Sequence, residues 1–231
     1  MKNLIFAINA FKFVLHIYYK KNIENMGLQR KLIGQGNRNE IYEITMPNGD
    51  KIVLRTCNSK ILDKTVKMWE QTKKAGLKTT SFLEPSSDRG KSVLLTESLD
   101  TNDSYYISPN TDNNTNNTKE WELSQNKIIE ILNFKEFVVE MMKVAERAAK
   151  RSLSVFSDAY FYKIEKGKNR IKLDYVIADW ENICETKYDS KLINGNKNFV
   201  LDSLYQFVNK YVDDNGSQKR RYLDEIENSR P

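Results

Sequence analysis

The sequence predicts an α+β protein with a small antiparallel sheet in its N-terminal part and a reduced, mainly helical C-terminal part. Two observations support this fold class. Short strand-like segments separated by glycine-containing turns, with one helix among them, fill residues 30–96. Beyond a polar, Asn-rich stretch at 100–119, longer segments with helical apolar periodicity dominate. We therefore expect two lobes joined by a variable connection.

The N-terminal part, residues 28–99, contains five expected strands and one helix. A glycine turn separates the first two strands, and Pro47–Asp50 forms the turn into the third. Ser59 caps the helix and Gly76 ends it. A further turn at 85–90 separates the last two strands. The expected strands are 30–34, 40–46, 51–56, 80–84 and 91–96, and the expected helix is 60–75.

The polar stretch at 100–119 is too poor in apolar residues to bury a core, and we expect a mobile insert. The helical part, residues 120–231, begins with a long helix whose apolar face runs from Phe134 to Ala148. Two strand-like runs follow at 160–165 and 170–178, and a last amphipathic helix carries apolar residues from Val200 to Tyr211. The charged tail from 213 gives no clear secondary-structure signal.

Residues 1–27 form a separate extension with an apolar run at 4–19. We favour a helix that lies on the N-terminal lobe or on a protein partner. Lys12 interrupts the run and no clear cleavage site follows, which argues against a signal peptide, and the run is short for a membrane span. Association with a membrane surface remains the alternative. His16, the only histidine, lies here, so a histidine catalyst is not expected.

Composition limits the environment and the ligand class. The chain has 231 residues, a net charge of +6 and a pI near 9.1, which suit a phosphate-rich ligand or simply a Lys-rich surface. Its two cysteines have no neighbours at metal-ligand spacing, which favours a reducing, cytoplasmic compartment. Aromatic residues are not interleaved with the Lys and Arg residues of 143–172, which argues against nucleic-acid binding.

The first candidate functional residues lie around the glycine turn. Gly34 and Gly36 would let the main chain approach phosphate oxygens without an intervening Cβ. Arg55, at the end of the third strand, would direct a guanidinium under that turn. These residues predict a phosphate-binding loop with an adjacent cation.

Three carboxylates follow in an order that suits phosphoryl transfer, which requires charge neutralisation and positioning more than covalent chemistry. Glu70, on the helix after the third strand, could hold Arg55 in place. Asp158 precedes the two strand-like runs, and Asp179 follows the apolar residues Val176–Ala178. An aspartate directly after a buried strand is a candidate Mg²⁺ ligand, although each of these residues is also compatible with a structural role.

The order of glycine turn, cation, Glu, Asp and Asp over residues 30–205 resembles the protein-kinase-like superfamily. The segments GNRNEIYEITMPNGDKIVLR and AGLKTTSFLE are most similar to the aminoglycoside phosphotransferase and choline kinase branch. The resemblance implies a bilobal kinase-like fold with ATP and Mg²⁺ as cofactors. Arg55 would contact the nucleotide phosphates and Glu70 would pair with it. Glu97 and Leu99 would belong to the segment that binds adenine.

The resemblance also assigns the helical lobe. Asp158 would be the catalytic base, Asp179 the magnesium ligand and Asp202 the buried aspartate that braces the catalytic loop. The sequence departs from the family at several positions: Phe156 replaces a His or Tyr, Asn39 replaces the third glycine, and Lys163 replaces a magnesium-binding asparagine. Lys163 could supply the missing positive charge itself.

Three functions remain in view. The first is an ATP- and Mg²⁺-dependent phosphotransferase acting on a protein Ser/Thr or a small-molecule hydroxyl. The second is a pseudokinase that serves as a scaffold, with or without bound nucleotide. The third is a binder of nucleic acid or of membrane surfaces.

Overall fold

The computed structural model describes residues 29–35, 40–45, 49, 51–57, 59–88, 91–101, 103–109, 122–123, 125–214 and 216–231. The apolar run at 4–19, His16, Gly36 and Asn39 lie outside the described residues. Among the described residues, no helix combines the length and the apolar character needed to span a bilayer. Two compact units are present. The first contains the described residues up to 64 together with 81–98, and the second contains 65–80 and the described residues from 99 onward.

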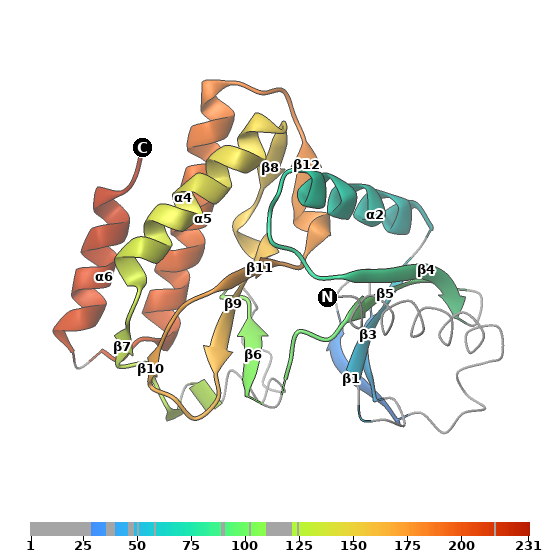
Figure 1. Cartoon of the computed structure of the whole chain (residues 1–231), viewed down its shortest axis with the longest axis horizontal. Coiled ribbons are helices and arrows are strands. Elements are labelled where there is room, and N and C mark those ends of the chain that lie inside the picture. The colour runs from blue at the N-terminus through green and yellow to red at the C-terminus, as the bar shows by residue number, and fades with distance from the viewer. Residues whose placement is uncertain are drawn as a thin grey trace, which may run out of the picture. The chain divides into compact units, whose positions relative to one another are not determined.

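The first unit is a five-stranded antiparallel sheet with the strand order β1-β2-β3-β5-β4. Figure 1 labels β1, β3, β4 and β5. One face of this sheet is apolar and buried, and its buried side chains are Ile44, Ile52, Leu54 and Leu95. The strands are β1 (Gln29–Gln35), β2 (Glu40–Thr45), β3 (Lys51–Cys57), β4 (Phe82–Asp88) and β5 (Lys91–Glu97). The antiparallel N-terminal sheet expected from the sequence is therefore confirmed.

The expected strand at 80–84 is displaced along the sequence. β4 begins at Phe82 and runs through Pro85 to Asp88, residues that were expected to lie in a turn. Proline lacks an N–H group and is tolerated in a strand only where that group is not needed, typically at a sheet edge. β4 is one of the two edge strands of this sheet, which explains why Pro85 does not end it.

Helix α2 (Ser59–Lys74) connects the sheet strands β3 and β4 and contributes to both units. Its apolar positions Leu62 and Met68 are buried. Gly76 ends it with a φ of 68°, a backbone conformation that glycine adopts without strain. The residues after Gly76 turn back and pair with the helical unit, since Thr79 forms a parallel bridge with Ile177.

The second unit packs helices against a three-stranded antiparallel sheet of order β11-β9-β6. Helices α4 and α5 contact each other, and α6 contacts both (Figure 1). The helices are α4 (Phe134–Lys150), α5 (Ser190–Tyr211) and α6 (Ser217–Asn228). The strands are β6 (Ser104–Ile107), β7 (Glu130–Ile131), β8 (Leu153–Val155), β9 (Tyr160–Glu165), β10 (Arg170–Ile171), β11 (Tyr175–Ile177) and β12 (Ile183–Glu185). A mainly helical C-terminal part is confirmed.

Two sequence expectations need correction in this unit. The stretch at 100–119 is not entirely a polar insert, because β6 at its start pairs with β9 and buries Tyr105 and Ile107. The expected strand at 170–178 is divided into β10 and β11, which belong to different sheets. The tail after 213 forms α6, which is docked through Tyr222: its ring lies 4.3 Å from that of Phe134.

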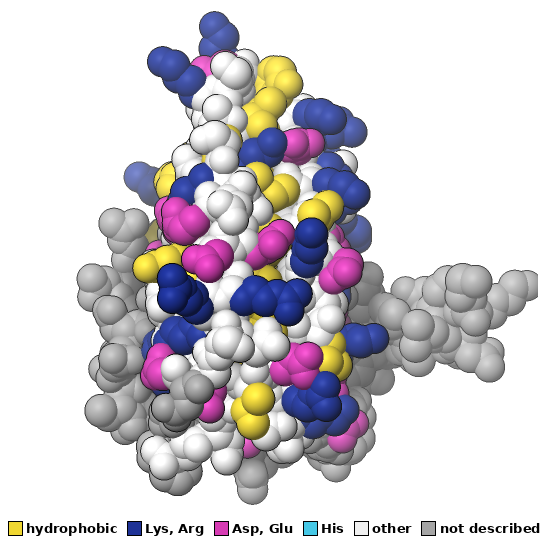
Figure 2. Space-filling model, turned by 90° about the vertical axis from the view of Figure 1, so that its left-hand side faces the viewer, with side chains coloured by type: hydrophobic (Ala, Val, Ile, Leu, Met, Phe, Trp, Pro, Cys, Tyr) yellow, Lys and Arg dark blue, Asp and Glu magenta, His cyan; other side chains and the backbone are white. Residues whose placement is uncertain are grey.

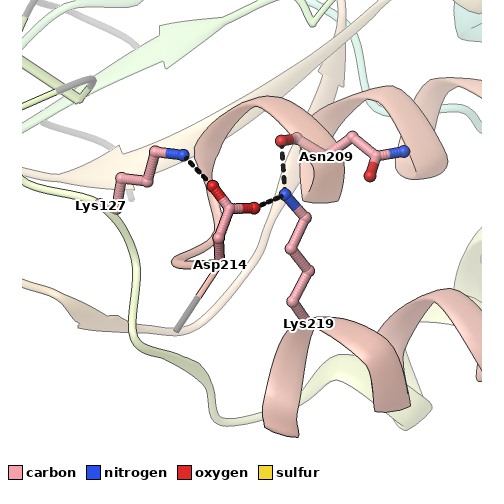
Figure 3. Close-up of polar contacts among 4 residues, drawn as sticks. All are labelled: Lys127, Asn209, Asp214 and Lys219. Atoms are coloured by element: carbon pink, nitrogen blue, oxygen red, sulfur yellow. Dashed lines mark hydrogen bonds and ion pairs between the residues drawn. The ribbon is translucent and has the colours of Figure 1, made fainter. Parts of the chain in front are cut away.

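A small network of charged residues joins α5 to α6. Asp214, between the two helices, accepts hydrogen bonds from Lys127 (2.9 Å) and from Lys219. Lys219 also donates to the backbone carbonyl of Asn209 at 2.8 Å (Figure 3). The two ammonium groups lower the pKa of the Asp214 carboxyl to about 2. The network links the end of α5 to the first turn of α6.

Candidate functional site

Two short 3-10 turns lie at one end of the β9–β11 ladder: Asp158 is within the first, and Asp179 directly precedes the second. Tyr160 is paired with Ile177, and the backbone N–H of Ala178 donates to the carbonyl of Ala159 at 3.2 Å, so the pairing extends one residue beyond the strands. Asp158 and Asp179 occupy the next position on each side. The turns 157–159 and 180–182 also contact each other. The structure therefore brings the turns that carry these two aspartates together.

Asn182 links the two turns. Its side-chain amide donates to Oδ2 of Asp179 at 3.1 Å, and its backbone N–H donates to the Asp179 carbonyl at 3.2 Å. Its own carbonyl accepts a hydrogen bond from the N–H of Phe156 at 3.1 Å, directly before the Asp158 turn. Sequence reasoning missed this residue. The signal was an Asn three positions after an Asp, a spacing suited to such a turn.

Asp158 lies on the exposed side of its turn, and Ser157 Oγ donates to its Oδ1 at 3.2 Å. Phe156 is 39% exposed beside it, with its ring 4.8 Å from that of Phe199. Tyr160, the first residue of β9 and two positions after Asp158, is fully buried, and burial raises the pKa of its hydroxyl. A neutral buried phenol is not available as a base.

Asn196 on α5 holds the strand that leads to Asp158, and it is completely buried. Its Oδ1 accepts from the N–H of Val155 at 3.1 Å, and its Nδ2 donates to the carbonyls of Leu153 (2.8 Å) and Ala145 (3.3 Å). In an antiparallel ladder, alternate residues direct their backbone groups away from the partner strand. The side-chain amide of Asn196 thus makes the hydrogen bonds that a neighbouring strand would make with β8, at the edge of β8 opposite β12.

The role expected for Asp202 was wrong. Its side chain is 47% exposed and pairs with Arg230 Nη1 at 3.0 Å, near the end of the chain. Asp202 is therefore not a buried brace. Asn196, less than two helical turns earlier on α5, makes the contacts that a brace of the Asp158 loop requires.

Lys163 lies in the middle of β9, where its N–H donates to the Asp174 carbonyl at 2.9 Å. It follows Tyr160 by three strand residues, which corresponds to about 10 Å along the chain. The reason is that β9 begins only two residues after Asp158. The structure does not bring the backbone of Lys163 to the two aspartates.

In the sheet unit, Gly34 and Arg55 lie on one row that crosses three strands. Gly34 is paired with Ile41, and Ile41 is paired with Arg55. Adjacent strands are about 4.8 Å apart, so the two backbones are separated by about 10 Å. The β1–β2 register shifts between Leu32 and Gly34, and Arg55 is half-buried. The sheet thus places the predicted cation and the first predicted glycine on one cross-strand row, with about 10 Å between their backbones.

The other residues predicted to bind the nucleotide, Glu70, Glu97 and Leu99, are divided between the two units. Glu70 is 51% exposed, and its Oε2 lies 3.9 Å from Lys74 Nζ. Its expected pairing with Arg55 stays a prediction. Glu97 Oε1 accepts from the N–H of Ser81 at 2.7 Å, and the N–H of Glu97 donates to the Ser81 carbonyl at 3.3 Å. Leu99 is half-buried directly after this strand.

The chemistry of the aspartate site suits a hard cation. Carboxylate and amide oxygens from Asp158, Asp179 and Asn182 are the ligand types that Mg²⁺ binds. In the described part of the chain, no group of three or more His, Cys, Asp or Glu side chains forms a complete metal site.

The surface in Figure 2 carries interspersed charges of both signs, with scattered hydrophobic side chains. Ion pairs at the surface of the helical unit also combine both signs, for example Arg170 with Glu130. Binding to a nucleic-acid backbone uses a continuous positive surface. This face does not provide one.

No protein-family model matches the sequence, and no curated protein matches it. Solved structures do match the fold. Among them is the Rio2 kinase–ADP/Mg²⁺–phosphoaspartate complex from Chaetomium thermophilum, with a TM-score of 0.53 and 9% sequence identity. The match covers 95% of this chain and 66% of that chain, so the present sequence spans just under two thirds of that protein's length. This similarity supports a kinase-like fold.

Proposed function

We propose that this protein is an ATP- and Mg²⁺-dependent phosphotransferase. The observation that carries the proposal is the position of Asp158 and Asp179 on contacting turns at one end of the β9–β11 ladder. Asp179, oriented by Asn182, holds the magnesium ion, which neutralises charge on the nucleotide phosphates. Asp158 accepts the proton of the acceptor hydroxyl, a role that its exposed position suits.

Residues of the sheet unit bind the nucleotide in this proposal. Gly34 and Gly36 give backbone access to the phosphates, and Arg55 provides their cation. Glu70 supports Arg55. The chain from Glu97 to Leu99 presents backbone groups to adenine. Because the N–H groups of Glu97 and Ser98 already donate to carbonyls of Ser81 and Lys51, Leu99 is the favoured donor.

The acceptor is a protein Ser/Thr or a small-molecule hydroxyl. The exposed ring of Phe156, two residues before Asp158, offers an apolar contact to either. The Rio2 kinase structure is a phosphoaspartate complex, so a phosphoryl group held on an aspartate of this chain is a third outcome to test. Neutral hydroxylamine cleaves an acyl phosphate but leaves a phosphate ester intact, so it distinguishes the two.

The direct test is incubation of the purified protein with γ-labelled ATP and Mg²⁺. We expect label transfer or phosphate release that Asp179→Asn lowers by at least about 100-fold, because a hard anionic ligand is lost at the transferring group. Asp224→Asn is the matched control, since Asp224 is exposed on α6. Equal turnover in the Asp179→Asn variant and the wild type would refute the assignment.

A second candidate function is a nucleotide-binding pseudokinase. It is favoured by Lys163, which replaces the usual asparagine and lies along β9 away from the aspartates. The two functions differ in turnover but share nucleotide binding. ATP with Mg²⁺ at a hundredfold excess over Kd should stabilise the fold by about 2.7 kcal/mol. For a chain of this size that is a rise of about 5–11 °C in Tm.

Arg55 variants test whether this rise in Tm depends on the sheet unit. Arg55→Ala should remove most of the shift, and Arg55→Lys should retain part of it, because a point charge still reaches phosphate without bidentate geometry. Binding without turnover, with any acceptor, would favour the pseudokinase. No shift in a folded protein at millimolar ATP and Mg²⁺ would contradict both functions.

A further inference from the structure

The two residues after Leu77 make hydrogen bonds on both sides of Asp179. The N–H of Ile177 donates to the carbonyl of Lys78 at 2.9 Å. The Thr79 hydroxyl donates to the carbonyl of Ile177 at 2.8 Å. The indole N–H of Trp180 donates to the same hydroxyl oxygen at 2.8 Å. Residues 177 and 180, which flank Asp179, are therefore both tied to the segment Lys78–Thr79.

The side chain of Thr79 is suited to this position because a hydroxyl both donates and accepts a hydrogen bond. It donates toward the strand before Asp179 and accepts from the ring after it. Trp180 is only 2% exposed, so its indole N–H would lack a water partner if the hydroxyl were removed. Valine has the same shape as threonine but offers neither interaction.

The segment is itself held firmly by the end of α2. The N–H of Leu77 donates to the carbonyl of Thr72 at 3.2 Å, and the indole of Trp69 donates to the carbonyl of Thr80 at 2.9 Å. Lys78 also pairs with Asp174, just before β11. Packing of Leu77, which is 4% exposed, completes the anchor. The orientation of the Asp179 turn is thus coupled to the C-terminal end of α2.

From these contacts we infer that Thr79 is a positioning residue for Asp179, which sets its carboxylate for Mg²⁺ and thereby determines metal affinity. The inference rests on the proposed function for the role of Asp179. Mg²⁺ requires near-ideal octahedral geometry, so a turn that can tilt binds it less well. Loss of residues that support metal ligands typically lowers metal affinity 10- to 100-fold.

The test compares Thr79→Val with Thr79→Ser in the full-length chain. We measure the Mg²⁺ concentration that gives half of the ATP-dependent rise in Tm. The Val variant should raise this concentration about 10-fold or more, and the Ser variant should stay within about twofold of wild type. Thr72→Val is the matched control. Thr72 is fully buried, but its hydroxyl only bonds back to the Met68 carbonyl within α2.

A second readout needs no nucleotide. In the ligand-free protein, Thr79→Val should speed amide hydrogen exchange at residues 177–182 and shift the indole N–H resonance of Trp180, while exchange in α4 stays unchanged. A purely structural role would lower Tm without changing the half-saturating Mg²⁺ concentration. That result would overturn the inference.

The outcomes separate this inference from the proposed function. If the wild type shows no Mg²⁺-dependent response, the proposed function fails, and the hydrogen-exchange result alone decides whether Thr79 orients the turn. Unchanged exchange at 177–182 would refute the orienting role. If Thr79→Val does not fold, Trp180→Phe removes the same indole bond and keeps an aromatic ring, and the same two measurements apply.

Discussion

Replacement of Asn196 by alanine tests how the Asp158 turn is supported. Three hydrogen bonds are lost, to the N–H of Val155 and to the carbonyls of Leu153 and Ala145. The Ala145 carbonyl lies within α4 and has helical partners, so its loss is the least costly. The groups of Val155 and Leu153 face away from β12, and both residues are fully buried. They would be left unsatisfied.

Each buried unsatisfied group costs about 1–3 kcal/mol, so two groups cost about 2–6 kcal/mol. At about 2–4 °C per kcal/mol for a chain of this size, a central value of about 4 kcal/mol lowers Tm by about 8–16 °C. The free energy of unfolding of most domains is about 5–15 kcal/mol, so we expect the variant to remain folded at low temperature.

Urea and thermal denaturation measure this loss, and two controls lie on the same helix. Asn194→Ala changes an exposed asparagine, and Asp202→Ala removes the exposed ion pair with Arg230; each should cost less than about 1 kcal/mol. If Asn196→Ala costs no more than the controls, then Asn196 does not brace β8. If Asp202→Ala costs more than Asn196→Ala, the bracing role returns to Asp202.

Two further predictions concern the attachment of α6. Lys219 and Lys127 lower the pKa of Asp214 to about 2, below its unfolded value of about 3.9. The Asp214 carboxylate therefore favours the folded state above pH 4, and this stabilisation is lost as the pH falls from 4 to 2. Asp214→Asn should remove that part of the pH dependence in an acid titration of Tm (Figure 3), and an unchanged profile would contradict it. Tyr222→Phe should cost about 1–3 kcal/mol in urea denaturation, because the hydroxyl accepts from the N–H of Ile131 (2.8 Å) and donates to its carbonyl (3.2 Å). Tyr205→Phe, on the exposed side of α5, is the control, and an equal cost for both variants would refute the role of the Tyr222 hydroxyl.

The sequence was sufficient for the elements whose signal is local. The apolar periodicity of Phe134–Ala148 predicts α4, and Gly76 predicts the end of α2, because each depends on residues within a few positions. Strand β6 was missed because Tyr105–Ile107 is only a short apolar run among polar residues. Tyr105 and Ile107 become core through pairing with Ile164 and Tyr162 of β9, far along the sequence. That information is not present in the local pattern.

The candidate site divides in the same way. Asp158 and Asp179 were identified because each stands beside an apolar strand, and the β9–β11 register brings their turns together. The residues that orient them were not identified. Asn182, Asn196 and Thr79 act through hydrogen bonds whose partners are known only once the fold is known. The mistaken choice of Asp202 shows the same limit, since a family pattern identifies the helix but does not identify which of its polar residues is buried.

The short turn between Asp158 and β9 limits the role that Lys163 can have. A residue five positions after Asp158 is near it only if the intervening chain is curled, and here most of that chain is an extended strand. A second metal ligand at this position is therefore disfavoured by the backbone as well as by the change to lysine. If the protein transfers phosphate, it does so with the carboxylate of Asp179, held by Asn182 and by the Thr79–Trp180 contact, as the central metal ligand. Catalysis would then depend on the rigidity of one turn, and for that reason the support of this turn is the property most worth perturbing.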